Sequence, residues 1–501
     1  MPLFRKVLIA NRGEIAVRII RTCRAMGIPT VAVFSEADRS ARHVVEADEA
    51  FPIGPAEAIR SYLSIDALID AARQSGAEAV HPGYGFLSQN GDFADAVRDA
   101  GLVFVGPPGD VHRRMGDKRG ARRHMADAGV PVLPGYGGDD QSDARLLAEA
   151  KAVGWPVMLK PSRGGGGKGM RVVRREEEFE SALFASRREA KAAFDDDAMV
   201  IERCLERPRH VEVQIVADGE GTVLHLGERE CSVQRRHQKV VEETPSPALS
   251  PDQREALCAA GVAAARSVGY VNAGTVEFLL APDGTFSFLE MNTRLQVEHP
   301  VTEAVTGIDI VRLQLEVAAG RSLGLSQQHV EPRGHALECR LYAEDPANDD
   351  LPSPGRILHL EEPEGPGIRV DSGLVVGSEV TVHYDPLLAK VVTWGFDRRE
   401  AVERMRDALR RTVVLGVVTN LARLVAVVEH PEFEAGTLHT GFIEEHLSGL
   451  SPRPCPPLEA VAAVAAVLAG VRRWGSGGPG PARAMPDPWA SLGPWRLGNG
   501  S

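Results

Sequence analysis

Two glutamates lie on either side of a short turn near the middle of the chain. Residues 275–280 and 286–290 are rich in β-branched and aromatic side chains, and the Asp-Gly dipeptide between them predicts a tight β-hairpin. In a hairpin symmetric about this dipeptide, Glu277 lies directly opposite Glu290. Facing carboxylates repel each other, and a hard divalent cation such as Mg²⁺ removes that repulsion. The pair predicts a magnesium site completed by water and substrate phosphates. The alternative is two solvated glutamates at a sheet edge, which the surrounding apolar residues disfavour.

Polar residues continue at alternate positions after the second glutamate. If the strand runs on, one of its faces carries Asn292, Arg294, Gln296 and Glu298. The asparagine offers a further oxygen ligand for a metal, the arginine a fixed positive charge for an anion, and the last glutamate a general base. Polar and apolar residues also alternate in a strand with one face in water. The residue types, more than their spacing, therefore indicate chemistry.

A run of glycines with one lysine occupies residues 164–169, between two predicted strands at 157–160 and 170–173. It does not open a helix, as a dinucleotide-binding motif must, and Lys168 is not followed by the Ser or Thr of a P-loop. Backbone N–H groups of such a hairpin can fold over phosphates, and Lys160 adds a positive charge. The run therefore favours a phosphate-binding hairpin, with a flexible surface hairpin as the alternative.

Residues 234–239 concentrate positive charge in a chain that is acidic overall. They read Gln-Arg-Arg-His-Gln-Lys, and a solvated loop is the commoner fate of such a block. Together with the hairpin carboxylates and the glycine run, the block indicates an ATP·Mg²⁺ site beside an anion pocket.

The elements expected to hold these residues change along the chain. A strand at 6–10, a helix at 14–26 and a strand at 30–34 form a βαβ opening, but the turn after the first strand lacks the glycines that NAD binding needs. A further strand, at 79–80, leads into a glycine-rich turn with His81 and Tyr84, which is either a ligand-binding loop or structural. From about residue 143 the pattern becomes antiparallel. The fold class is therefore α/β followed by α+β.

Composition limits the possible functions. The 501 residues suffice for about three domains, and 57 basic against 69 acidic residues leave a net charge of −12, which argues against nonspecific binding to nucleic acid or to an anionic membrane. The six cysteines form no C-x-x-C pair, so neither a disulfide framework nor a thiolate zinc site is expected. With no secretory signal and no apolar run of membrane-spanning length, we expect a cytoplasmic protein.

Taken together, these motifs closely resemble those of biotin carboxylase, the ATP-grasp subunit or domain of biotin-dependent carboxylases. The resemblance runs from about residue 6 to about residue 447 and rests on IANRGEIAVRII, HPGYGFLS, MGDK, GGGGKGMRVV, ERECSVQRRHQKVVEE, EMNTRLQVEHPVTE, GHALECRLYAEDP and YDPLLAKV. The later stretches GVVTN, HPEFEAG and DPWASLGPWRLG are most similar to the α subunits of methylcrotonyl-CoA-type and related acyl-CoA carboxylases.

The resemblance implies a Rossmann-like N-domain at 1–113, an ATP-grasp core at 114–330 with a mobile lid at 132–203, a biotin carboxylase C-terminal domain at 331–447, and a Pro/Gly/Ala-rich tail or linker at 448–501. It implies that ATP, with Mg²⁺ or Mn²⁺, phosphorylates bicarbonate to carboxyphosphate. This intermediate releases CO₂, and N1 of carrier-bound biotin is carboxylated. That is the first half-reaction of an acyl-CoA carboxylase.

The resemblance also implies roles for individual residues. ATP would be bound by Lys118, Lys160, Gly166, Gly167, Glu202, Arg203, Cys204, Leu205, His210 and His237. The metal ligands would be Glu277, Glu290 and Asn292. Bicarbonate would be bound by Lys239, Arg294, Gln296 and Val297, with Glu298 as the base and Arg340 stabilising the biotin enolate near Tyr84.

Three positions depart from the family pattern. Gln89 stands where many members carry Glu, Arg163 occupies a normally small position before the glycines, and Cys204 often has an aromatic counterpart.

Two other functions stay open. One is another ATP-grasp ligase that activates a carboxylate as an acyl phosphate, which the presence of Arg294, Gln296 and Glu298 disfavours. The other is a degenerate scaffold subunit.

Partners follow from the resemblance. We expect a biotin carboxyl carrier protein, a carboxyltransferase subunit, and association into a homo-oligomer. The related α subunits continue into a biotinyl domain with an Ala-Met-Lys-Met turn, whereas here the nearest match is Ala484-Met485-Pro486 and no lysine follows Lys390. The expectation is a carrier supplied in trans.

Overall fold

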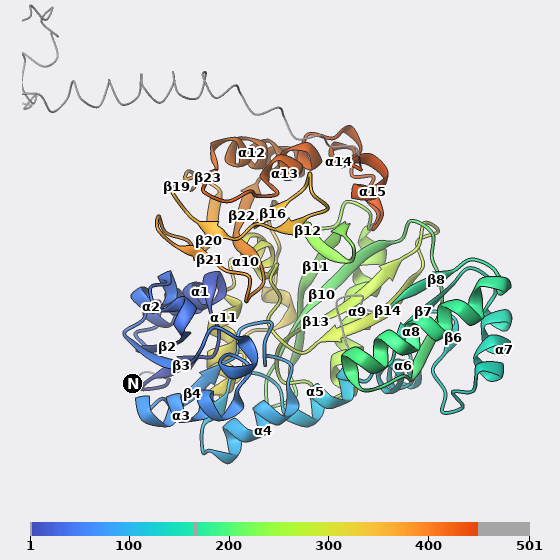
Figure 1. Cartoon of the computed structure of the whole chain (residues 1–501), viewed down its shortest axis with the longest axis horizontal. Helices are drawn as coiled ribbons and strands as arrows, with labels where there is room; N and C mark the ends of the chain where they lie inside the picture. Colours follow the sequence, from blue (N-terminus) through green and yellow to red (C-terminus); the bar gives the residue numbers. More distant parts are fainter. Residues whose placement is uncertain (1–2, 164–168, 449–501) are drawn as a thin grey trace, which may run out of the picture. The chain divides into compact units, whose positions relative to one another are not determined.

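The first part of the fold is a five-stranded parallel sheet ordered β3-β2-β1-β4-β5. The structure is a computed structural model that describes residues 3–163 and 169–448. The elements of this part, blue in Figure 1, are β1 (Val7–Ile9), α1 (Gly13–Ala25), β2 (Thr30–Ser35), α2 (Arg42–Glu46), β3 (Glu49–Gly54), α3 (Ile65–Ser75), β4 (Ala79–His81), α4 (Gly91–Asp99) and β5 (Val103–Phe104). The predicted βαβ opening is confirmed, because β1 and β2 pair in parallel on either side of α1.

A smaller four-stranded sheet, β6-β9-β7-β8, follows two connecting helices. Its elements are α5 (Gly109–Gly116), α6 (Lys118–Asp127), β6 (Gly135–Tyr136), α7 (Asp143–Val153), β7 (Val157–Pro161), β8 (Arg171–Val173), α8 (Phe179–Phe194) and β9 (Met199–Arg203). Leu146 of α7 and Phe179 of α8 pack with Leu159 and Ile201 of the strands into one apolar core, so both helices cover this sheet (Figure 1). The strands predicted on either side of the glycine run are confirmed, whereas residues 164–168, including Gly166 and Gly167, lie outside the described residues.

The largest sheet has eight strands in the order β14-β13-β10-β11-β12-β15-β22-β20. The strands are β10 (Arg209–Ala217), β11 (Val223–Arg235), β12 (Gln238–Thr244), β13 (Asn272–Leu280), β14 (Phe286–Asn292), β15 (His335–Tyr342), β20 (Ile368–Ser372) and β22 (Leu387–Gly395). Strands from the C-terminal part therefore extend the sheet of the middle part, with Glu242 of β12 facing Glu338 of β15.

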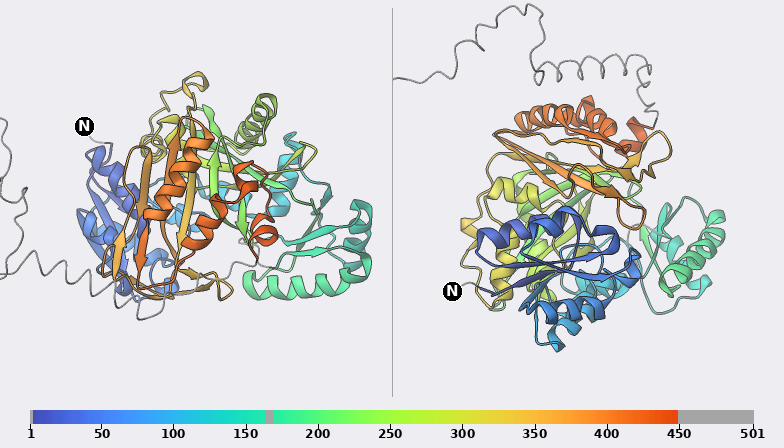
Figure 2. Two further views of the ribbon diagram at one scale, coloured as in Figure 1. Left: turned by 90° about the horizontal axis from the view of Figure 1, so that it is seen from above. Right: turned by 60° about the vertical axis from the view of Figure 1, so that its left-hand side comes forward.

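The helices of the second half flank this sheet. They are α9 (Pro251–Ser267), α10 (His299–Thr306), α11 (Ile310–Ala318), α12 (Arg398–Arg411), α13 (Leu421–Val428), α14 (Pro431–Glu434) and α15 (Phe442–His446). Figure 2 shows α12 alongside the C-terminal strands, where Met405 and Leu409 share a core with Leu337 and Val391. Three small strand pairs complete this part: β16 (Glu344–Asp345) with β17 (Leu351–Pro352), β18 (Gly355–Arg356) with β21 (Glu379–Val380), and β19 (His359–Glu361) with β23 (Val413–Leu415).

The predicted facing of two glutamates in the β13–β14 hairpin is confirmed, since Glu277 pairs with Glu290. The register that produces it differs from the one expected. Near the turn, Phe278 pairs with Phe288, and the register shifts by one residue before Glu277, leaving Leu289 as a bulge. Without that bulge, Glu277 would face Leu289, so an irregularity invisible in the sequence brings the carboxylates together.

The strand expected to run on to Glu298 ends instead at Asn292. Residues 293–298 form an irregular segment, and Glu298 is the N-terminal capping residue of α10. Because the chain leaves the sheet here, the side chains after Asn292 turn toward several different elements instead of sharing one strand face. The prediction of a continuous strand as far as Glu298 is therefore wrong.

An ion cluster joins the first part to the rest. The Arg18 guanidinium of α1 lies 2.7 Å from Glu303 of α10 and 2.9 Å from Asp309, which caps α11. Arg369 of β20 also donates to Glu303, at 2.8 Å. Elements from all three parts of the chain therefore meet around one buried carboxylate.

We expect Phe278→Ala to lower the free energy of unfolding by about 3–5 kcal/mol, because it empties a large volume in the core of the eight-stranded sheet. Phe278 is fully buried and its ring lies 5.5 Å from that of Phe286. Urea denaturation followed by circular dichroism measures the change. Phe396→Ala is the matched control, because Phe396 is 84 % exposed and its loss should change stability by less than about 0.5 kcal/mol. Equal effects of the two changes would contradict the expectation.

Candidate active site

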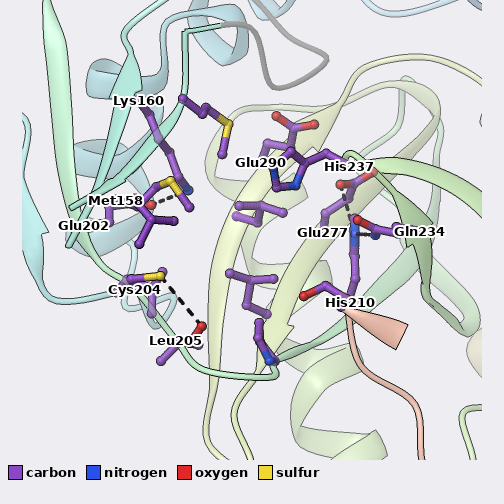
Figure 3. Close-up of a pocket in the computed structure, with 18 of the residues that line it drawn as sticks. Met158, Lys160, Glu202, Cys204, Leu205, His210, Gln234, His237, Glu277 and Glu290 are labelled. Carbon is purple, nitrogen blue, oxygen red and sulfur yellow. Dashed lines mark hydrogen bonds and ion pairs between the residues drawn. The ribbon is translucent and has the colours of Figure 1, made fainter. Parts of the chain in front are cut away.

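A cavity of about 920 Å³ opens between the small sheet and the eight-stranded sheet. Figure 3 shows its two walls, with Lys160, Glu202 and Cys204 on one side and His210 and Glu277 on the other. Of the residues predicted for the site, the cavity is lined by Lys118, Lys160, Glu202, Arg203, Cys204, Leu205, His210, His237, Lys239, Glu277, Glu290, Asn292, Arg294, Gln296, Val297 and Arg340. The fold therefore brings together residues up to about two hundred positions apart.

The first wall carries two lysines. Lys160 on β7 is buried, and its ammonium pairs with Glu202 on β9. Lys118 begins α6, where its backbone N–H donates to the carbonyl of Ser162 at 3.0 Å. Burial lowers the pKa of Lys118, although Glu290 across the cavity acts in the opposite direction. Both lysines are thus placed to meet an anion such as a phosphate chain.

The second wall centres on Glu277, and both oxygens of its carboxylate have polar partners. Its Oε1 accepts from Lys239 at 2.8 Å, from the Asn292 amide at 2.8 Å and from the Gln296 amide at 2.9 Å. Its Oε2 lies 2.8 Å from Nε2 of His210. Burial acts to raise the pKa of Glu277, but Lys239 and His210 outweigh it, so its pKa is lowered and the carboxylate stays ionised.

The donor chemistry fits a hard divalent cation. Glu277 and Glu290 face each other across the hairpin and both line the cavity, with Asn292 two residues further along β14. Carboxylate and amide oxygens are the ligands that Mg²⁺ prefers, usually one or two carboxylates with water and phosphate. These three residues would hold the ion.

A chain of charges leads from Glu277 to Arg340. The Lys239 ammonium contacts Glu212, Glu277 and, at 2.6 Å, Glu298. The other oxygen of Glu298 accepts from Arg340 at 2.9 Å. Glu298 is fully buried, and although burial acts to raise its pKa, Lys239 and Arg340 hold that pKa well below its usual range.

Two of the residues predicted for the site, Glu298 and Tyr84, do not line the cavity. Glu298 reaches it only through Lys239 and Arg340. The ring of Tyr84 lies 5.8 Å from the ammonium of Lys390, which donates to the backbone carbonyl of Val297 at 2.9 Å. The structure therefore joins Tyr84 to the anion pocket through Lys390 and not by direct lining.

The basic block at 234–239 is a hairpin and not a solvated loop. Arg236 and His237 form its turn, both with positive φ, between β11 and β12. Alternation then turns Gln234 and Lys239 inward, where Gln234 Nε2 lies 2.6 Å from Nδ1 of His210. The turn presents His237 to the cavity while the next strand supplies Lys239.

Several supporting residues were missed in the sequence. Glu212 faces Glu277 across β10 and β13, Arg229 donates to Glu212 at 2.6 Å, and Glu242 accepts from Arg340 at 2.6 Å. A signal for Glu212 was present, because positions 210, 212 and 214 are polar while the positions between them are apolar.

Two sheets that close on a cavity, with lysines on one wall and facing carboxylates on the other, define the ATP-grasp class. Family models match three successive stretches: biotin carboxylase, N-terminal domain, at 3–111; carbamoyl-phosphate synthase L chain, ATP binding domain, at 117–326; and biotin carboxylase C-terminal domain at 338–445. A biotin carboxylase from a Nostoc species is 49 % identical over 88 % of this chain and 99 % of its own length. The chain therefore belongs to the biotin carboxylase family.

Two further relatives bear on function. The mitochondrial methylcrotonoyl-CoA carboxylase subunit alpha of Mus musculus is 52 % identical over 89 % of this chain, and the chain spans 62 % of that protein's length. The biotin carboxylase domain of Hydrogenobacter thermophilus 2-oxoglutarate carboxylase, solved with MgADP, ADP and bicarbonate, superposes with a TM-score of 0.86 at 45 % identity, over 88 % of this chain and 98 % of that one. In residues 3–163 and 169–448, no helix is both long and apolar enough to cross a membrane.

Glu290→Gln should weaken Mg²⁺-dependent nucleotide binding by about tenfold or more, because it removes one of two ligand charges while preserving shape. Calorimetric titration of ATP at several Mg²⁺ concentrations measures the effect. Asp283→Asn is the matched control, since it removes a charge from the exposed turn of the same hairpin. An unchanged Mg²⁺ dependence in Glu290→Gln would rule out a metal between the facing glutamates.

Proposed function

We propose that this chain catalyses the ATP-dependent carboxylation of carrier-bound biotin by bicarbonate through carboxyphosphate, the first half-reaction of an acyl-CoA carboxylase. The observation that carries the proposal is the continuous set of contacts from Glu277 through Lys239 and Glu298 to Arg340. A buried carboxylate, Glu298, lies between two cations that both line the cavity. The MgADP and bicarbonate of the Hydrogenobacter domain support the same assignment.

We assign the nucleotide to the wall of the small sheet. Backbone groups near Glu202, Arg203, Cys204 and Leu205 would hold the adenine, and the side chains of Lys118, Lys160, His210 and His237 would contact the rest of ATP. Gly166 and Gly167 are proposed to cover the phosphates. Mg²⁺ or Mn²⁺ bound to Glu277, Glu290 and Asn292 would neutralise charge on the transferred phosphoryl group. The pairing of Lys160 with Glu202 means that a phosphate competes with a carboxylate for that ammonium.

Bicarbonate is assigned to Lys239, Arg294, Gln296 and the backbone of Val297. In the structure Lys239 and Arg340 hold Glu298 ionised. An anion that draws these two cations toward itself weakens their hold on Glu298 and raises its affinity for a proton. Binding of the substrate would thus prepare the base that deprotonates it.

Biotin is assigned to the end of the cavity at Arg340. Its guanidinium is shared between Glu298 and Glu242 and is buried, so it is fixed in position by two carboxylates. A fixed guanidinium donates two N–H groups toward an oxygen that gains negative charge, as the ureido oxygen of biotin does when N1 loses its proton. Tyr84, reached through Lys390, is proposed to border this end.

The partners of the chain are proposed from its relatives. These are named as subunits of biotin-dependent carboxylases, including a methylcrotonoyl-CoA carboxylase and a pyruvate carboxylase. A biotin carboxyl carrier protein and a carboxyltransferase subunit are therefore the partners we propose, and a homo-oligomer and a cytoplasmic location stay predictions. The division into domains at 1–113, 114–330 and 331–447 is likewise a proposal, which the three successive family matches support.

Hydrolysis of ATP that requires bicarbonate and is stimulated by free biotin is the expected result for the purified chain. Phosphate release with each of the two omitted in turn measures it. Turnover with another carboxylate or with ammonia in place of biotin would instead favour a different ATP-grasp ligase, and failure to bind MgATP would favour a scaffold subunit.

We expect Glu298→Gln to lower biotin-dependent turnover by about 10²- to 10⁴-fold, because an amide preserves shape and cannot accept the bicarbonate proton. ATP affinity should change little, since Glu298 does not line the cavity. Steady-state kinetics and ATP titration separate the two effects, and Glu255→Gln on the exposed face of α9 controls for the loss of one negative charge. A large loss of ATP binding with little change in the chemical step would identify Glu298 as structural.

A further inference from the structure

Arg294 differs from the other cations of the anion pocket in the groups that hold it. Its Nε donates to Oε1 of Gln89 at 2.7 Å, and its Nη1 and Nη2 donate to the amide oxygens of Gln296 at 2.6 Å and Asn292 at 3.1 Å. A fourth bond goes to the backbone carbonyl of Leu295. All four acceptors are neutral.

Lys239 and Arg340 are held by carboxylates instead. Lys239 contacts three of them, and Arg340 contacts Glu242 and Glu298. Among the described residues, no carboxylate lies within the 4 Å ion-pair distance of Arg294. An arginine keeps its charge in any protein environment. Arg294 is therefore oriented by four hydrogen bonds while its positive charge is not offset by a carboxylate in direct contact.

Gln89 reaches this guanidinium from a different part of the fold. It lies between β4 and α4, in a turn fixed by the backbone bonds from Ser88 to Gly85 and from Asn90 to Leu87. Asn90 caps α4 by accepting from the N–H of Phe93. The backbone at Gln89 is thus set by its own turn, and its side chain crosses to a residue more than two hundred positions away.

We propose that Gln89 is a positioning residue that orients Arg294 without neutralising it, and so strengthens the attraction of the pocket for bicarbonate. This inference rests on the proposed function. Bicarbonate carries one negative charge, and its attraction to a guanidinium falls when a carboxylate shares that guanidinium. A glutamate at position 89 would be such a carboxylate, whereas the amide of Gln89 carries no net charge.

The size of the effect follows from exposure. Gln89 is exposed, and ion pairs exposed to solvent contribute little, so the change in bicarbonate affinity should be modest and should shrink with salt. An isosteric Gln89→Glu exchange should raise the KM for bicarbonate about two- to fivefold at low ionic strength, with KM for ATP and kcat near their wild-type values. The difference should fall at high salt.

Gln89→Met separates orientation from charge. It keeps the length of the side chain and removes the acceptor, so Arg294 loses one of its four bonds without gaining a carboxylate. The KM for bicarbonate should again rise, but with no added dependence on salt. Gln74→Glu, on the exposed face of α3, is the matched control for the added negative charge and should leave every parameter unchanged.

The experiment measures bicarbonate-dependent ATP hydrolysis with free biotin for the wild type and the three variants at two salt concentrations. No bicarbonate dependence in the wild type would overturn the proposed function and this inference with it. Wild-type activity combined with an unchanged or lower KM for bicarbonate in Gln89→Glu would overturn this inference alone. A rise of equal size and salt dependence in Gln74→Glu would also overturn it.

Discussion

The site depends on one buried cluster of opposite charges around Lys239. Removing a carboxylate or an ammonium from water is unfavourable by several kcal/mol, and only close opposite charges and hydrogen bonds offset that. Lys239 meets Glu212, Glu277 and Glu298, and Arg340 continues the cluster through Glu298. These residues come from β10, β12, β13, β15 and the start of α10, so the cluster is complete only when all five elements are in place. The same contacts that permit burial therefore fix the positions of the residues proposed for catalysis.

Carboxylates outnumber cations in this cluster, and the pKa values record the imbalance. Burial raises the pKa of Glu242 to about 7, although Arg340 acts against it, and burial also raises the pKa of Glu212 despite Arg229 and Lys239. Glu277 and Glu298 have lowered pKa values, because the attraction of the neighbouring cations outweighs the effect of burial at these two carboxylates. Glu277 belongs both to this cluster, through Lys239, and to the pair of glutamates that face each other across the hairpin.

Much of this arrangement was predictable from the sequence, and the exceptions have physical reasons. Residue types and short turns identified the hairpin, the parallel opening and the facing of Glu277 and Glu290. Near the turn the two strands pair one residue away from the expected register, and the bulge at Leu289 restores that register at Glu277 and Glu290. Bulges leave no simple sequence signal. Polar alternation found Arg294, Gln296 and Glu298 although no strand exists there, since it reports which positions are polar and not which backbone carries them. Glu242 was missed because its role comes from pairing with β15, almost one hundred residues away.

The cations of the pocket divide into two kinds by their partners, and this division accounts for how one small space could hold both the proposed base, Glu298, and the proposed bicarbonate. Lys239 and Arg340 are bound to carboxylates, so they stabilise Glu298 as an anion inside the protein. Arg294 is bound to amides and a backbone carbonyl, so its charge is directed to whatever anion enters. If every cation were paired with a carboxylate, the pocket would keep Glu298 ionised and attract an anion weakly. If none were, the buried glutamate would protonate and could not act as the proposed base. Amide acceptors at one cation and carboxylate acceptors at the other two meet both requirements within a single set of hydrogen bonds.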